Sequence, residues 1–219
     1  MFDKLFKRHS STASGVALDF TSTSRWVVLD TETTGLSLWR DRVISIAAVA
    51  IQLDPDLRSA RIDLGDTFEA VIRQDHLKAN KDNILIHHIG VGAQSHGHSQ
   101  EQVLAWFAQW IGQSPLFAYH APFDRAMLTN AYKKSSLAVP ANPWVDIQPL
   151  ANWVTRDTHM LGLDECMALF DLNCIVRHQA ASDTFLTAEL LLKIMPRLRE
   201  VASSFEQVQR LSLQNVIRT

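Results

Sequence analysis

The sequence has few cysteines, no long apolar run and almost no net charge. Its two cysteines are Cys166 and Cys174. Because no secretory leader is recognisable, we expect them to be reduced core thiols rather than a disulfide. No stretch approaches the roughly 18 apolar residues of a membrane-spanning helix. These absences argue against a secreted or membrane-embedded protein and predict a cytoplasmic protein that contacts no membrane.

The charge balance also excludes a general affinity for polyanions. A formal net charge of -2 gives no overall attraction to nucleic acid or to anionic lipid. Such a partner would have to be held by a local basic patch or through metal ions. The length of 219 residues and the hydrophobic content of 47% fit one soluble globular domain.

Residues 1–24 differ in character from this domain, which we assign to residues 25–219. Phe2, Leu5 and Phe6 are interspersed with basic residues in a short amphipathic segment, and the Ser-rich link SSTASG follows. The segment could serve as a handle for a protein partner, or it could pack on its own domain. Both fit the pattern.

Strand and helix patterns alternate along the rest of the chain. Strands are predicted over 25–29, 43–53 and 67–72, and the short turn-forming connections between them favour antiparallel neighbours. Short strands are also predicted in PLFAY and NPWVDI. Helical periodicity covers 99–111, 123–134, 163–170, 182–195 and 204–217. The sequence therefore predicts an α/β fold with a mixed central sheet of about five strands flanked by helices.

Two carboxylates end the first strand, in the stretch VVLDTET. Side chains two apart in a strand point to the same face, so Asp30 and Glu32 should project together from alpha carbons roughly 6 to 7 Å apart. Two such close anions repel each other. A solvated turn would be the ordinary explanation, and a bound cation is the functional one.

Two further acids strengthen the cation interpretation. Asp124 lies at the start of a predicted helix after the strand LFAY, and Asp183 lies in the first turn of another helix. Each alone could be a helix cap. Strand ends and helix starts in an open α/β sheet commonly meet at one crevice. Four acids meeting there would need divalent cations, and oxygen ligands favour Mg²⁺ or Mn²⁺.

The order of these motifs resembles the epsilon-like 3′→5′ exonucleases of the DnaQ/RNase T superfamily, which carry the DEDDh signature. LDTETTGL resembles their first motif, FAYHAPFD their second and HQAASD their third. The resemblance implies a ribonuclease-H-like fold and a metal-dependent exonuclease. Two Mg²⁺ or Mn²⁺ ions would be held by Asp30, Glu32, Asp124 and Asp183, and nucleoside monophosphates would be released from DNA 3′ ends.

The resemblance also implies roles for neighbouring residues. His178 would be the general base, a role that suits an imidazole because its ordinary pKa lies near neutrality. Thr33, Gly35 and Leu36 would contact the terminal nucleotide, and His87 would approach the scissile phosphate.

The motifs also depart from the family pattern beside the metal ligands. Members often have His-Asn where this chain has Tyr119-His120, and Gly where it has His88. These departures leave metal binding intact but leave substrate preference open.

The sequence leaves three candidate functions. A DNA exonuclease acting on single-stranded or frayed 3′ ends is favoured by the TETTG form of the first motif. An RNA-trimming 3′→5′ exoribonuclease would use the same catalytic residues. A catalytically silent nucleic-acid-binding module is disfavoured because all five catalytic residues are present. The short segment after the last catalytic helix has no flexible linker, which favours a stand-alone enzyme, or one with an N-terminal handle, over a tethered proofreading subunit.

Overall fold

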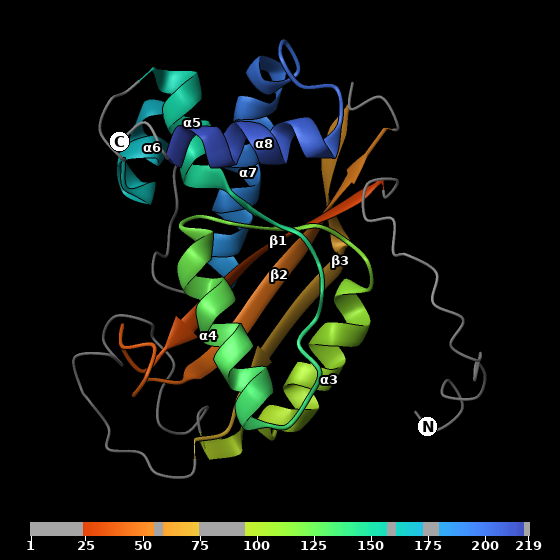
Figure 1. Cartoon of the computed structure of the whole chain (residues 1–219), viewed down its shortest axis with the longest axis vertical. Helices are drawn as coiled ribbons and strands as arrows, with labels where there is room; N and C mark the ends of the chain where they lie inside the picture. The colour runs from red at the N-terminus through yellow and green to blue at the C-terminus, as the bar shows by residue number, and fades with distance from the viewer. Residues whose placement is uncertain (1–23, 55–58, 75–94, 157–160, 173–179, 217–219) are drawn as a thin grey trace.

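The computed structural model describes residues 24–54, 59–74, 95–156, 161–172 and 180–216. Within these residues a five-stranded mixed sheet has the order β3-β2-β1-β4-β5 (Figure 1). The strands are β1 (Arg25–Thr33), β2 (Val43–Leu53), β3 (Ala60–Val71), β4 (Leu116–Ala118) and β5 (Trp144–Asp146). β1 pairs antiparallel with β2, and β2 with β3, whereas β4 runs parallel to β1 and to β5. The predicted α/β fold with a mixed sheet is confirmed.

Helices cover both faces of this sheet. They are α3 (Gln100–Ile111), α4 (Ala121–Lys134), α5 (Ile147–Thr155), α6 (Leu163–Leu169), α7 (Ala180–Leu198) and α8 (Phe205–Val216). The apolar cores on the two faces contain alternate residues of β1. Trp26 and Val28 pack in one core with α5, α7 and α8, whereas Val27 and Leu29 pack in the other with α3 and α4. Double-sided burial explains why β2 reads as a nearly continuous apolar run.

Several element boundaries differ from the sequence prediction. β1 continues past Leu29 to Thr33 because its acidic end still pairs with β2. β3 begins at Ala60 rather than at residue 67, since its first half pairs with the end of β2. The helix predicted over 182–195 is longer at both ends and does not stop before Pro196. α7 continues to the buried Leu198, because a proline in the final turn removes only one backbone donor.

Two elements show how local chemistry sets the helix starts. Ser99 caps α3 by accepting a hydrogen bond from the Gln102 backbone N–H at 3.3 Å. The helix α5 was not predicted. Its cap is Asp146, whose carboxylate accepts from the Gln148 N–H at 3.1 Å.

The last helix lies against the edge strand β5. Gln209 Nε2 of α8 donates to the Trp144 carbonyl at 3.1 Å, and Ser212 Oγ donates to the Asp146 carbonyl at 2.8 Å. Phe205, which opens the helix, contacts the Trp26 ring edge-on with centroids 6.1 Å apart. α8 therefore joins the edge of the sheet to the core.

Some predictions concern other parts of the chain. The appendage over 1–24 lies, apart from Ser24, outside the described residues, and so does Cys174. Cys166 is buried in the core, as expected, and its Sγ lies 3.1 Å from the Tyr119 hydroxyl. Among the helices of the described ranges, none combines the length and apolar character needed to cross a membrane.

Candidate active site

Three of the four predicted acids converge at the end of β1. Asp30, Glu32 and Asp183 each offer a carboxylate oxygen, and these oxygens lie within 4.8 Å of one another. Asp30 and Glu32 continue the alternation of Trp26 and Val28, so they project from the face that α7 covers. Asp183 lies in the first turn of that helix and is 8% exposed. The set of closely spaced carboxylates fits the hard oxygen coordination that Mg²⁺ and Mn²⁺ prefer.

The start of α7 is held next to this cluster by a side chain. Thr184 Oγ1 donates to the carbonyl of Ala47 at 3.2 Å, and Ala47 is the β2 partner of Asp30. Because Thr184 follows Asp183 directly, this hydrogen bond holds the first turn of α7 beside the strand position of Asp30. The Asp183 carboxylate is thereby kept near the Asp30 carboxylate. Thr184 is 2% exposed, so the hydrogen bond is shielded from competing water.

Asp124 reaches the same strand end from the opposite face. Its Oδ1 accepts two hydrogen bonds from Thr31, from the backbone N–H at 3.0 Å and from Oγ1 at 2.7 Å. Thr31 lies between the two acids of β1, and its side chain points to the α4 side. Asp124 is 4% exposed, and burial raises its pKa to about 7 against the lowering effect of the two Thr31 bonds. The structure thus sets the fourth acid against the strand residue between Asp30 and Glu32.

Thr31 is a site residue that the sequence analysis missed. The sequence did contain a signal for it. Side chains alternate along a strand, so the residue between Asp30 and Glu32 must point to the opposite face. Its partner could not be read from the chain, since Asp124 is 93 positions away.

The turn before α4 contains Tyr119 and His120, where this chain departs from the family pattern, whereas His88 lies outside the described residues. His120 adopts a left-handed backbone conformation with φ 60°, and its N–H donates to Asp146 Oδ1 at 2.9 Å. The hydroxyl of Tyr119 donates to the Leu161 carbonyl at 2.7 Å. Both residues therefore fix the strand-to-helix turn that positions Asp124.

The loop after β1 is fixed by a carboxylate. Asp41 accepts from Thr34 Oγ1 at 2.9 Å and from the Ser37 N–H at 2.8 Å. A Cβ at Gly35 would lie 2.6 Å from an Asp41 carboxylate oxygen, so a larger residue here would push this carboxylate away from its hydrogen bonds to Thr34 and Ser37. Leu36 projects outward and is 84% exposed, next to the acidic strand end.

Two predicted residues fall elsewhere. His178 and His87 lie outside the described residues, and their roles stay predictions. The same is true of the nucleotide contacts expected of Thr33, whose Oγ1 here donates to the Gly35 carbonyl at 2.8 Å.

Comparison with known proteins identifies the family. Residues 27–191 match the family RNase_T, described as exonuclease. The sequence is 26% identical over 193 residues to a DNA polymerase III of the PolC type from Staphylococcus haemolyticus, a match that covers 85% of this chain and 13% of that protein. A PolC-type polymerase from Staphylococcus aureus is 26% identical over 176 residues, covering 80% of this chain and 12% of its own length.

Solved structures share the fold. Cell-death related nuclease 4 superposes with a TM-score of 0.69 at 18% identity, covering 80% of this chain and 65% of its own. Exonuclease X, solved with 5′ overhanging duplex DNA, gives a TM-score of 0.62 at 20% identity and covers 85% and 99%. These likenesses confirm the predicted ribonuclease-H-like fold. The family match covers most of the chain and confirms the resemblance drawn from its motifs, so the protein belongs to the RNase_T exonuclease family.

Proposed function

We propose that this protein is a metal-dependent 3′→5′ exonuclease that releases nucleoside monophosphates from DNA 3′ ends. The observation that carries the proposal is the meeting of Asp30, Glu32 and Asp183 within 4.8 Å in a member of an exonuclease family. Clustered carboxylates repel one another without a cation, so the arrangement favours a site built for divalent ions.

In this proposal, the acidic residues bind the metal ions. Asp30, Glu32 and Asp183, together with Asp124, would hold two Mg²⁺ or Mn²⁺ ions. When bound, such ions would stabilise charge on the attacking and leaving oxygens of phosphodiester hydrolysis. Thr31 orients Asp124 through its two hydrogen bonds and favours the ionised carboxylate that metal binding requires.

Other residues would handle the substrate. His178 would accept the proton of the attacking water, since a neutral imidazole is a good base near pH 7. The exposed Leu36, with Thr33 and Gly35, would position the terminal nucleotide. His87 would approach the scissile phosphate.

DNA is favoured as the substrate by what the relatives' names state. The sequence relatives are DNA polymerases, and Exonuclease X and E. coli Exonuclease I were solved with DNA. Because the chain matches only about an eighth of the polymerase length, polymerisation is not part of the proposal. A fold relative described as a 3′-exonuclease recognises a histone mRNA stem-loop, which keeps RNA trimming as the second candidate. A protein partner bound through residues 1–24 also stays a proposal.

Matched DNA and RNA oligonucleotides test this function directly. We expect the purified protein to release mononucleotides from the 3′ end of single-stranded DNA with Mg²⁺ or Mn²⁺, and to lose activity in chelator. Asp30→Asn should abolish turnover while the melting curve shows a folded protein. Faster trimming of the RNA oligonucleotide would move the assignment to an exoribonuclease, and nicking of closed circular DNA as the main activity would refute an exonuclease.

A further inference from the structure

A trough of two adjoining cavities runs along the outer side of α4. The wider cavity has a volume of about 660 Å³, and the narrower one about 310 Å³. Both are lined by Arg125, Thr129 and Trp144, so they adjoin at these residues. We define the α4 trough by Trp39, Pro122, Arg125, Thr129, Lys133 and Trp144. Its wider end includes Ala121 and Pro122 in the first turn of α4, the turn that also contains Asp124, although none of the four acids lines the cavity.

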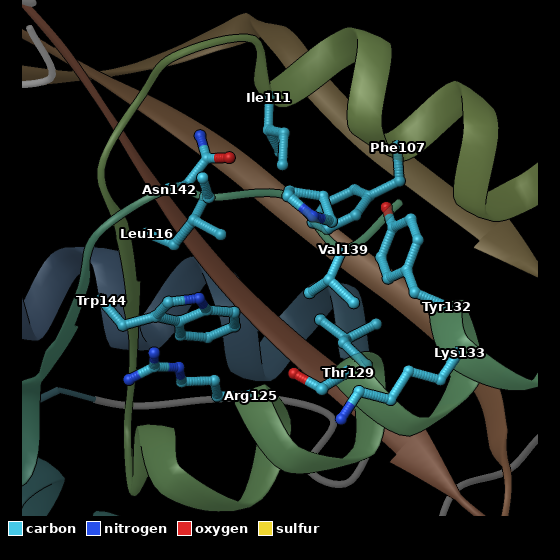
Figure 2. Close-up of a pocket in the computed structure, with 13 residues that line it drawn as sticks. Phe107, Ile111, Leu116, Arg125, Thr129, Tyr132, Lys133, Val139, Asn142 and Trp144 are labelled. Carbon is cyan, nitrogen blue, oxygen red and sulfur yellow. The ribbon is translucent and has the colours of Figure 1, made fainter. Parts of the chain in front are cut away.

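Cationic side chains form one wall of the trough. Arg125, Thr129 and Lys133 follow one another at intervals of four residues, which places them in a row on one side of the helix. Figure 2 shows this row along one side of the narrower cavity, with the Trp144 ring above Arg125. Within the described parts of the chain, no hydrogen bond or ion pair engages the Arg125 or Lys133 side chain. Both charges are therefore available to an anion.

An exposed aromatic ring lines the wider cavity. Trp39 is 89% exposed, although a side chain of this size normally gains much from burial. The loop that bears it is fixed to α4, because Asn130 Nδ2 donates to the Leu38 carbonyl at 2.9 Å. The ring is thus presented by an anchored loop, and its faces are open to a planar partner.

One acid also borders the wider cavity. Asp146 lines it, but its Oδ1 accepts from the backbone N–H groups of His120 and Gln148 at 2.9 and 3.1 Å. These bonds direct its charge toward the protein. Among the described residues, the charged lining therefore consists of two cations that are not hydrogen-bonded or ion-paired and one hydrogen-bonded carboxylate, which favours an anionic occupant.

We propose that the α4 trough holds the single-stranded part of the substrate upstream of its 3′-terminal nucleotide. Bases would stack on Trp39 and Trp144, and phosphates would meet Arg125 and Lys133, the combination that sequence-independent single-strand binders use. The inference rests on the proposed exonuclease function for its polarity. From Ala121 to Lys133 the helix rises roughly 18 Å, at about 1.5 Å per residue. A stacked strand advances about 3.4 Å per nucleotide, so the trough accommodates roughly five nucleotides.

Substrate length provides the first test. Steady-state kinetics are measured on oligothymidylates of increasing length and on the p-nitrophenyl ester of thymidine 5′-monophosphate, which occupies the terminal site alone. We expect KM to fall with each added nucleotide until roughly six are present and then to stay constant. A KM that does not depend on length would overturn the inference, whereas hydrolysis of neither the ester nor the oligonucleotides would refute the proposed function.

Matched variants provide the second test. Trp39→Ala and Arg125→Ala should each lower the ratio of kcat/KM for a twelve-nucleotide strand to that for the ester by about tenfold, the scale of losing one stacked base. Trp106→Ala on α3 and Arg61→Ala on β3, at the opposite edge of the sheet, are the controls and should keep the wild-type ratio.

Binding gives a readout that does not need turnover. Fluorescence anisotropy of the labelled strand in Ca²⁺ should show a weaker affinity, again by about tenfold, for the two trough variants and not for the controls. Unchanged binding and kinetics in both trough variants would reject a nucleic-acid track and make an apolar, acidic peptide the better occupant of the trough.

Discussion

Replacing Asp124 by Asn should stabilise the metal-free protein at alkaline pH while it abolishes nuclease activity. The wild-type carboxyl group has a pKa of about 7 in the folded protein because it is buried, compared with an ordinary value of 3.8. Between pH 3.8 and 7, Asp124 is therefore protonated in the folded protein and ionised in the unfolded chain. This contribution to stability is fully present below pH 3.8 and is lost as the pH rises through 7.

The size of the effect follows from the separation of the two values. Each pH unit between the unfolded and folded pKa values of Asp124 corresponds to about 1.4 kcal/mol. By pH 8, this difference lowers the unfolding free energy of the wild type by about 4 kcal/mol. An Asn side chain stays neutral, and its carbonyl oxygen can accept both Thr31 bonds. The variant should avoid that cost and lack this pH dependence.

Urea denaturation in chelator at a series of pH values measures the difference. The unfolding free energies of the wild type and Asp124→Asn should be close below pH 3.8 and diverge steadily as the pH rises toward 8, with the variant more stable. Asp63→Asn on β3 controls for the loss of a carboxylate elsewhere. Saturating Mn²⁺ should stabilise the wild type more than the variant, because only the wild type offers an ionised carboxylate here. Parallel curves in chelator would refute the reasoning.

Three other variants separate catalysis from stability. His178→Ala should lower kcat by about 10² to 10⁴-fold and remove the acidic limb of the pH–rate profile, whereas a structural histidine would leave that limb in place. Gly35→Ala places a methyl group against the Asp41 carboxylate and should lower the unfolding free energy by about 1 to 3 kcal/mol in urea titrations. Arg25→Met breaks the partly buried pair with Asp66, whose pKa Arg25 lowers. It should cost about 1 to 3 kcal/mol at pH 7 and less below pH 4, with unchanged turnover.

The acidic platform could be predicted because it depends on local periodicity. Asp30 and Glu32 share a face in any strand conformation, whatever packs against them. Asp183 could be placed near them through the order of the motifs. The cap of α3 was equally local, since Ser99 and its partner are three residues apart.

The environment of Asp124 could not be predicted in this way. The sequence suggested a single crevice for four acids, but it did not say which face of the sheet α4 would cover. Because α4 packs on the Val27 and Leu29 face, its aspartate meets the side of the strand that Thr31 presents. The α4 trough was equally hidden, because Trp39 and Trp144 are brought together only by tertiary packing.

The contacts between α8 and β5 have a consequence for solubility. β5 is an edge strand of three residues, and such an edge offers unpaired carbonyl groups to any passing strand. Gln209 and Ser212 occupy two of its carbonyls, so the helix blocks edge-to-edge association. A chain shortened before Phe205 would uncover this edge and the ring face of Trp26 together. Such a truncation should favour self-association, even though every acid of the active site would be retained.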